Sequence, residues 1–309
     1  VTGAVFGAVG TCGQRCTSTR RLIIHESVYD KVRDALVGAY DQLKIGSPLD
    51  ESNHVGPLTD ADAVTAFLTT IKKAQEEGGK VLCGGSVLTG GIYDTGLLIG
   101  LIYLGTVNKS YSSGSVTAQN GSNIGGLIGH NYRGTVKNSF STGTVIGKYK
   151  VGGLIGVSYS NGVTHPLIEN SYSRSNVTGS TYQSIGGLVG DHGYQGGTIT
   201  NSYSTGTVTS GSSGDWDAVG GFIGGNSVTA NTSINNSFWD TETSGKSTGI
   251  GSGTTTGVTG KTTSEMKTLS TYTSAGWDFT NETTNGSDDY WTIDGNTNDG
   301  YPYLKWQDK

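Results

Sequence analysis

The stretch GGLIGHNYRGTVKNSFSTGTV, residues 125–145, contains both motifs that recur along most of this 309-residue chain. The first motif is Gly-Gly followed by two apolar residues and Gly, and the second is Asn-Ser-aromatic followed by small polar residues. The two motifs keep step over five copies, which chance similarity in Gly- and Ser-rich sequence would not do. Self-similarity at a period of about 30 residues is typical of repeat architectures. The sequence therefore predicts a solenoid from about Gly96 onward.

Stacking buries an apolar face that no single unit can bury alone, so equivalent residues of successive units lie above one another. The first motif recurs at residues 96–100, where Leu97 replaces the second glycine, and at 125–129, 152–156, 186–190 and 220–224. The second motif recurs around Ser110, Ser139, Ser171, Ser202 and Ser237. Stacking predicts a structural ladder of aromatic rings and another of side-chain amides that bond from turn to turn. The aromatic ladder consists of Tyr111, Phe140, Tyr172, Tyr203 and Phe238, and the amide ladder of Asn138, Asn170, Asn201 and Asn236.

Composition divides the chain into three parts. Residues 1–91 hold all the cysteines, whereas residues 92–240 hold the repeats and are rich in Gly, Ser, Thr, Asn and Tyr. Beyond residue 240 the repeat fades, and the aromatic stretches GWDF, DYWTIDG and GYPYLKW follow. Because an open solenoid end exposes strand edges, we expect residues 241–309 to form a C-terminal cap. The predicted fold class is mainly β, a β-helix or solenoid with this cap, preceded by a small truncated α/β segment.

The front part shows both strand and helix patterns. RRLIIHE, residues 20–26, and KVLCGG, residues 80–85, are short apolar runs that predict strands. Between them, apolar residues recur at helical spacing after Ser27 and again near Thr59. The glycine pair at 78–79 is free to take the left-handed cap conformation that ends a helix. We therefore expect two amphipathic helices between two short strands.

Composition also excludes several classes of function. The net charge is −5 and no basic stripe is present, so we expect no nucleic-acid partner. No apolar run approaches the roughly 18 residues that a membrane span needs. The three cysteines, Cys12, Cys16 and Cys83, do not support a disulfide scaffold. The sequence begins at Val1 rather than Met, which indicates a fragment or a processed form.

No spacing of metal ligands supports a metal site. His25 and His54 are isolated, and no Cys/His pattern fits zinc. DGNTNDG, residues 294–300, has acidic and amide residues at the spacing of a calcium loop. However, Asp299 stands where such a loop needs Gly, and Lys305 where it needs Glu. We expect an Asx-rich turn before the closing strand and no bound metal.

Three stretches of the front part are the most specific signal in the chain: FGAVGTCGQRCTSTRRLIIHESVYDKV (6–32), LKIGSPLDESNHVGPL (43–58) and AQEEGGKVLCGG (74–85). They closely resemble the aldehyde dehydrogenase superfamily, and its antiquitin-like branch best. The resemblance implies that Cys16 is the thiolate nucleophile, which attacks an aldehyde to give a thiohemiacetal. Hydride transfer to NAD(P) then leaves a thioester for hydrolysis. It also implies that the Cys16 backbone N–H is half of the oxyanion hole, and that Cys12 is a packing residue.

The resemblance covers about 90 residues, and several functional parts of that family have no counterpart in this sequence. These are the dinucleotide-binding domain, the glutamate general base, the oxyanion-hole asparagine and the Glu-x-Phe-Gly-Pro motif expected after GGSVLTGG. One oxyanion-hole donor alone is worth roughly 10²–10³ in rate. We therefore expect Cys16 to be inactive in this chain. No cofactor is expected, and NAD(P) would bind only if the segment works as an aldehyde dehydrogenase.

The recurring GGLIG, GGLVG and GGFIG motifs, together with the tail from FWDTETSG to GYPYLKW, resemble proteins with GLUG repeats over residues 96–309. Such repeats occur in large secreted or surface bacterial proteins, including adhesin-like ones. The resemblance implies a β-helix-like fold and an extracellular or bacterial cell-surface location. It implies cell-surface, glycan or protein ligands as partners, and no particular reaction.

Three hypotheses of function follow. The first is a non-catalytic, adhesin-like structural or binding module, secreted or at the surface, that carries an inactive aldehyde dehydrogenase remnant. The second is an NAD(P)-dependent aldehyde dehydrogenase that forms a carboxylic acid through a Cys16 thioester, which favours a cytoplasmic location. The third is a chimera without evolved function, because one family stops and the other begins abruptly near residues 91–96.

Overall fold

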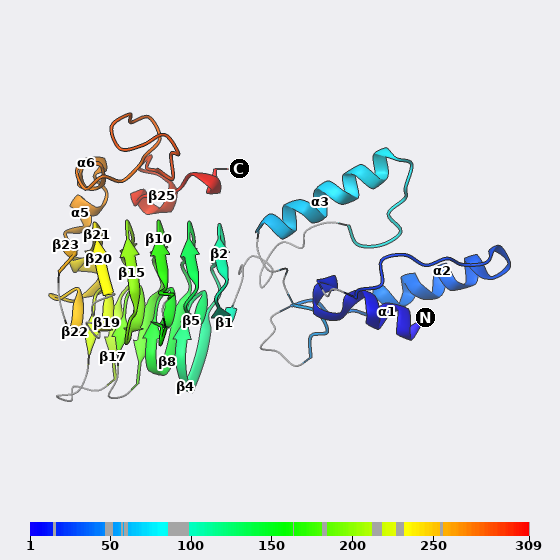
Figure 1. Ribbon diagram of the computed structural model, residues 1–309, viewed down its shortest axis with the longest axis horizontal. Helices are drawn as coiled ribbons and strands as arrows, with labels where there is room; N and C mark the ends of the chain where they lie inside the picture. Colours follow the sequence, from blue (N-terminus) through cyan, green and yellow to red (C-terminus); the bar gives the residue numbers. More distant parts are fainter. Residues whose placement is uncertain are drawn as a thin grey trace. The chain divides into compact units, whose positions relative to one another are not determined.

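A computed structural model gives the structure of the chain (Figure 1). It describes residues 1–14, 17–46, 52–56, 58, 61–85, 99–162, 164–180, 184–211, 218–226, 232–253 and 256–308. The chain forms two compact units, Val1–Leu97 and Leu98–Lys309.

The first unit is a helical segment in its described residues. It contains α1 (Thr2–Val9), the 3-10 helix η1 (Gly10–Gly13), α2 (Glu26–Tyr40) and α3 (Ala61–Glu76), with an isolated bridge between Ile45 and Val55. The helices α2 and α3 are the two expected from the apolar spacing. His25, rather than Ser27, caps α2, because its Nδ1 atom accepts a hydrogen bond from the Ser27 backbone N–H at 3.2 Å.

The two strands expected in the front part are not formed. Residues 20–26 and 80–85 pair with no other described segment, and Ile23 and Leu82 are exposed. A strand satisfies its backbone groups only by pairing, so an apolar run without a partner strand stays irregular. Val5 is the one buried hydrophobic residue among those described in this unit. In its described residues the front part is therefore helical rather than α/β, and these residues form almost no core.

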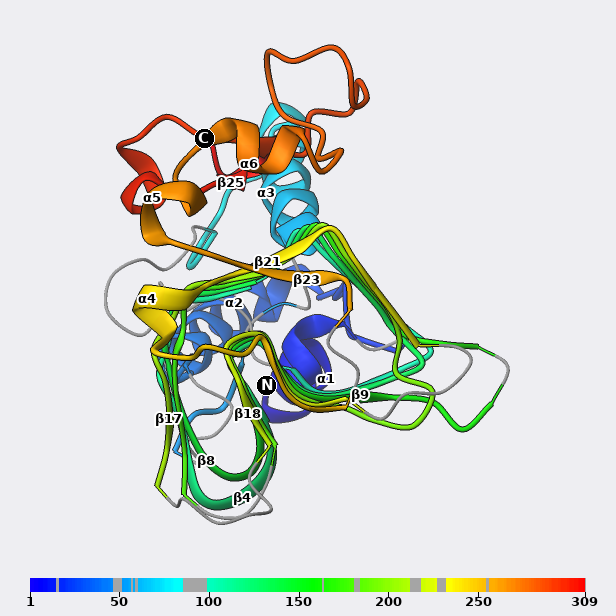
Figure 2. The same cartoon turned by 90° about the vertical axis from the view of Figure 1, so that its left-hand side faces the viewer.

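The second unit is a β-solenoid whose turns pair in parallel, and Figure 2 looks along its stack of turns. Four sheets run along the stack. The first contains β1 (Ile99–Tyr103), β5 (Ile128–Tyr132), β9 (Ile155–Tyr159), β14 (Val189–His192), β19 (Ile223–Asn226) and β22 (Ile250–Gly253). The second contains β2 (Thr106–Asn108), β6 (Thr135–Lys137), β10 (Leu167–Glu169), β15 (Gly197–Thr200) and β20 (Thr232–Asn235). The third contains β3 (Tyr111–Ser112), β7 (Phe140–Ser141), β11 (Tyr172–Ser173), β16 (Tyr203–Ser204), β21 (Ser237–Asp240) and β23 (Val258–Lys261).

The fourth sheet and the C-terminal elements complete the unit. The sheet contains β4 (Val116–Gly125), β8 (Thr144–Gly152), β12 (Asn176–Gly179), β13 (Ile185–Gly186), β17 (Val208–Ser210) and β18 (Val219–Gly220). The C-terminal elements are α4 (Thr241–Ser244), α5 (Thr263–Met266), α6 (Leu269–Thr273), β24 (Trp291–Thr292), η3 (Thr297–Gly300), β25 (Tyr303–Leu304) and η4 (Lys305–Gln307). Because β22 and β23 pair in parallel with β19 and β21, the stack continues to Lys261, past the boundary expected at residue 240.

The Gly-Gly-apolar-apolar-Gly motif builds the core of the solenoid. Its two apolar positions are fully buried in successive turns, as Leu127, Leu154, Leu188 and Phe222 and as Ile128, Ile155, Val189 and Ile223. The second glycine lets the turns approach closely. A Cβ atom on Gly153 would lie 2.1 Å from the carbonyl oxygen of Gly187 in the next turn, and any side chain there would force the turns apart.

The serine of the second motif forms a hydrogen-bonded ladder along the stack. Ser139 Oγ accepts from the Ser110 backbone N–H at 3.2 Å and donates to the Lys137 carbonyl at 2.7 Å. The same arrangement continues from turn to turn, through Ser171, Ser202 and Ser237. Each hydroxyl from Ser139 onward satisfies one buried donor and one partly buried acceptor, which explains why a small hydroxyl residue recurs at this position.

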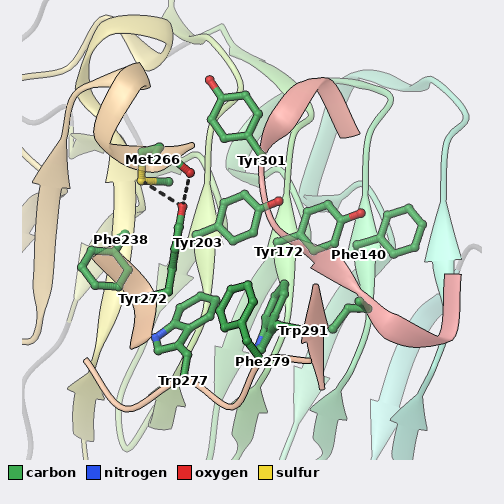
Figure 3. Close-up of a cluster of buried hydrophobic side chains, with 11 residues drawn as sticks. Phe140, Tyr172, Tyr203, Phe238, Met266, Tyr272, Trp277, Phe279, Trp291 and Tyr301 are labelled. Atoms are coloured by element: carbon green, nitrogen blue, oxygen red, sulfur yellow. Dashed lines mark hydrogen bonds between the residues drawn. The ribbon is translucent and has the colours of Figure 1, made fainter. Parts of the chain in front are cut away.

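The aromatic residues of the second motif stack on the outer face of the third sheet (Figure 3). The ring centroids are 5.2 Å apart for Tyr111 and Phe140, 4.8 Å for Phe140 and Tyr172, and 4.9 Å for Tyr172 and Tyr203. The last two pairs are within 2° of parallel. Phe238 lies at the equivalent backbone position in the next turn, but its ring packs edge-on against Tyr272 at 5.4 Å.

The amide ladder expected from the sequence is not formed by its four members, Asn138, Asn170, Asn201 and Asn236. Their backbones all have φ between 44° and 49°, in the left-handed region that Asn tolerates better than most residues. Among the described residues, no hydrogen bond joins one of these amides to the next. Asn138 Nδ2 instead donates to Asn108 Oδ1 at 2.9 Å, and Asn170 Oδ1 accepts from Trp291 Nε1 at 3.4 Å. The position therefore favours Asn for its backbone conformation.

Residues 262–308, here called the strap, lie along the aromatic ladder (Figures 1 and 3). Figure 2 shows α5, α6 and β25 outside strand β21. Buried strap side chains pack directly on the ladder, among them Met266, Tyr272, Trp277, Phe279, Trp291, Tyr301 and Leu304. The C-terminal segment thus covers a side of the stack, because the ladder rings project from the outer face of the sheet and need an apolar cover.

Candidate functional site

Cys16, the nucleophile implied by the family resemblance, lies outside the described residues. Its neighbour Cys12 is described, in η1. The Cys12 Sγ atom donates to the Gly56 carbonyl at 3.1 Å, and burial raises the pKa of this thiol. A raised pKa keeps Cys12 protonated at neutral pH, so it is not a reactive thiolate.

The described residues of the first unit do not fit NAD(P). A dinucleotide site of this kind needs a glycine-rich turn that joins a parallel strand to a helix. The described part of the unit has helices and one isolated bridge, and no sheet. Two cavities among the described residues, of about 200 and 310 Å³, share a lining of Leu22, Leu36 and Tyr40.

A cluster of aromatic side chains lies on the outer face of the first sheet of the solenoid. Tyr103, Tyr132 and Tyr159 occupy equivalent positions in β1, β5 and β9. The Tyr103 and Tyr132 rings are stacked, with centroids 5.3 Å apart and planes at 17°. The Tyr159 ring is turned by 69° from that of Tyr132 and stacks instead on His130, at 5.0 Å and 19°. We call Tyr103, His130, Tyr132 and Tyr159 the outer aromatic cluster.

Polar and charged side chains surround the outer aromatic cluster. The Arg133 guanidinium lies 5.8 Å from the centre of the Tyr132 ring, and the Tyr132 hydroxyl bonds to Asn161 Oδ1. Lys150 Nζ is 2.7 Å from Asp191 Oδ2, and Asp191 lies in the same register row as His130. Burial, and then the charge of Lys150, lower the pKa of His130, so this imidazole is neutral at pH 7. The surface thus combines ring faces with donors, acceptors and a cation.

None of the residues of the outer aromatic cluster was predicted from the sequence as a site residue. The signal was present, because Tyr103, Tyr132 and Tyr159 recur 29 and 27 residues apart, in step with the Gly-rich motif. The Asn-Ser-aromatic motif instead predicts the buried use of aromatic residues, as stacking partners in the ladder.

Comparison with known proteins separates the two units. Residues 1–111 match the model of the Aldehyde dehydrogenase family. The alpha-aminoadipic semialdehyde dehydrogenase of Rattus norvegicus is 43% identical over 102 residues, which are 32% of this chain and 19% of that protein. Aldehyde dehydrogenase family 7 member A1 of Pisum sativum is 53% identical over 83 residues, 27% of this chain and 16% of that protein. The chain therefore spans less than a fifth of the length of these relatives.

Residues 120–146 and 181–209 match the model of the GLUG motif. The chain is a composite of an aldehyde dehydrogenase fragment and GLUG repeats. The aldehyde dehydrogenase match ends at residue 111, but residues 99–111 contain β1, β2 and the start of β3, which pair with the second turn. The structural boundary is therefore that between the two units, at residues 97 and 98.

The described ranges contain neither a membrane-spanning helix nor a cluster of metal ligands. No helix there is long and apolar enough to cross a membrane. No group of three or more His, Cys, Asp or Glu side chains in the described part of the chain is placed to hold a metal ion. In DGNTNDG, Asp294 Oδ1 accepts from the backbone N–H groups of Asn296 and Thr297 at 2.9 and 2.7 Å. The segment forms an Asx-type turn before β25.

Proposed function

We propose that this protein is a non-catalytic structural or binding module of the adhesin-like type, secreted or held at a bacterial cell surface. In this proposal the first unit is an inactive aldehyde dehydrogenase remnant, and the partners are cell-surface, glycan or protein ligands. The observation that carries the proposal is the contrast between the units. The solenoid has a continuous core, a serine ladder and a strap-covered aromatic ladder, whereas the first unit buries one described hydrophobic residue.

The main alternative is an NAD(P)-dependent aldehyde dehydrogenase, which the match over residues 1–111 favours. The poor fit of the described residues to a dinucleotide argues against turnover by this chain alone. The two functions differ in what they need: a binding module needs the folded solenoid, and the enzyme needs Cys16 and NAD(P).

The proposal can be tested with the purified chain and its Cys16→Ala variant. We expect no NADH from aldehyde and NAD⁺ with either protein, and equal binding of both to bacterial or host cell surfaces. Fractionation of the source cells, probed with an antibody, should place the chain outside the cytoplasm. NADH formation that disappears in Cys16→Ala would instead establish the enzyme, and a purely cytosolic chain that binds no surface would refute the module.

A further inference from the structure

We propose that the outer aromatic cluster, with Arg133 and Asn161, is a saccharide-binding site. This inference rests on the proposed function of a binding module and names the site and the class of ligand. A saccharide presents an apolar ring face together with many hydroxyl groups, and its recognition therefore needs aromatic faces beside mixed donors and acceptors.

The first support is an aromatic face that the solenoid does not cover from the next turn. The Tyr159 ring departs from the stack of Tyr103 and Tyr132 and lies with one face on His130. The next position in its row is Gly193, where even a Cβ atom would be 3.4 Å from the Tyr159 Cβ. Glycine leaves this position without a side chain, so the equivalent position of the following turn places no ring or aliphatic group against Tyr159.

The second support is a group of buried polar atoms without partners at the same corner. His130 Nε2 and Arg133 Nε have no hydrogen-bond partner within the described structure, and the same holds for His165 Nδ1 and Gln195 Oε1 in the loops after β9 and β14. These loops are adjacent, because the Ser160 N–H donates to the Tyr194 carbonyl at 3.2 Å. A Cβ atom on Gly162 would lie 3.2 Å from the Arg133 guanidinium carbon, which places the first loop on Arg133.

Unsatisfied buried polar groups are rare in native proteins, and each costs about 1–3 kcal/mol. Four of them lie in β5, next to it and in the adjoining loops, so this corner holds more polar groups than it pairs within the described structure. A hydroxyl group both donates and accepts, so the hydroxyls of a saccharide suit a corner where donors and acceptors are mixed.

The charges at the site favour a saccharide that carries a carboxylate. Asp191 is compensated by Lys150, at 2.7 Å. Arg133 has no carboxylate partner among the described residues, and its charge is held beside the Tyr132 ring. A carboxylate on the ligand would give this guanidinium a charge-assisted hydrogen bond.

The test is an array of neutral and carboxylate-bearing oligosaccharides probed with the full chain, followed by calorimetric titration of the best binder. We expect Tyr159→Ala to weaken saccharide binding at least tenfold. We expect Arg133→Gln to weaken the binding of carboxylate-bearing saccharides and to leave the binding of neutral saccharides unchanged. Tyr194→Ala is the matched control, because Tyr194 is 60% exposed in a neighbouring loop and makes no ring contact in the cluster. Unchanged circular dichroism and melting temperature in each variant show that the fold is retained.

Two results would overturn the site: no saccharide bound by the chain, or a loss in Tyr159→Ala no larger than that in Tyr194→Ala. The same experiment distinguishes this failure from failure of the proposed function. If the chain still binds cell surfaces and the Tyr159 and Arg133 variants bind them equally well, the binding module is supported and the saccharide site is refuted. If the chain binds neither saccharides nor cell surfaces, the module and the saccharide site are both refuted.

Discussion

The Trp306 Nε1 atom donates a hydrogen bond to the Asn138 carbonyl at 2.9 Å, across 168 residues of chain. Earlier in the strap, Trp277 Nε1 donates to the Asn236 carbonyl at 2.8 Å. Asn138 and Asn236 occupy the same position in different turns, so the strap is fastened to the solenoid near both ends of the aromatic ladder. A cover attached in this way ties several turns to one another, in addition to the contacts that each turn makes with its neighbours.

Truncation of Trp291 tests how much the strap stabilises the solenoid. The Trp291 ring is fully buried and lies 4.7 Å from Trp277 and 5.9 Å from Tyr203, centroid to centroid. We expect Trp291→Ala to lower the free energy of unfolding by about 3–5 kcal/mol. Trp306→Phe is the control, because it keeps a ring and removes one hydrogen bond, for about 1 kcal/mol. Urea unfolding followed by circular dichroism measures both, and similar small losses would mean that the strap is dispensable.

The serine ladder makes a prediction about a single hydroxyl group. Ser171 Oγ accepts from the Ser139 N–H at 3.2 Å in a buried hydrogen bond, and it donates to the partly buried Glu169 carbonyl at 2.8 Å. Ser171→Ala leaves the buried N–H without its partner, so we expect a loss of about 1–3 kcal/mol in the free energy of unfolding. Ser180→Ala, at an exposed serine, should change it by less than about 0.5 kcal/mol. Equal effects in the two variants would show that the ladder does not stabilise the fold.

The sequence predicted those features that depend on the repeat period, and it missed those that depend on distant contacts. Tyr172 and Tyr203 could be placed on one another because two motifs kept the same register. The strap contact between Trp306 and Asn138 joins a repeat to a non-repeating segment, so no period reveals it. The prediction of a strand at residues 20–26 was wrong, because an apolar run becomes a strand only where a partner strand is available.

The candidate site shows the same limit more sharply. Cys16 could be named from its neighbourhood in the sequence, but it lies outside the described residues. The outer aromatic cluster depends on which face of β5 and β9 a tyrosine occupies and on the turn of one ring by 69°. Composition gives neither of these, because it cannot separate a tyrosine under the strap from one on the open face.

The left-handed position before each motif serine predicts a stabilising substitution. Lys109 has φ 49° in the first turn, at the position that Asn occupies in the later turns. Asn adopts this conformation at lower cost than Lys, so we expect Lys109→Asn to raise the free energy of unfolding by about 0.5–1 kcal/mol. Lys137→Asn, in strand β6, should give no gain, because Asn is unfavourable in strands. Thermal unfolding of both variants checks this, and a lower melting temperature in Lys109→Asn would contradict the conformational explanation.

His192 predicts how the stability of the solenoid depends on pH. Its side chain is fully buried, its Nε2 atom is 3.3 Å from the Gly197 carbonyl, and burial lowers its pKa from 6.5 to about 4. Above about pH 6.5 His192 is neutral in both the folded and the unfolded chain, so it does not change the free energy of unfolding with pH. Between about pH 6.5 and 4 the unfolded chain binds a proton that the folded chain does not, so stability falls as the pH falls. The free energy of unfolding falls by about 3 kcal/mol in total, because each tenfold difference in proton affinity between the folded and unfolded chain contributes about 1.4 kcal/mol.

The equivalent residues in neighbouring turns supply the variant that tests this effect. Asn226 pairs with His192 in the next turn, and Ser158 in the turn before. A polar residue that does not titrate is therefore compatible with the position, and His192→Asn should flatten the fall in stability between pH 6.5 and 4. His165→Asn, at a half-buried histidine of the neighbouring loop, should leave most of that fall in place. Urea unfolding at a series of pH values measures both, and an unchanged slope in His192→Asn would show that other groups control the acid sensitivity.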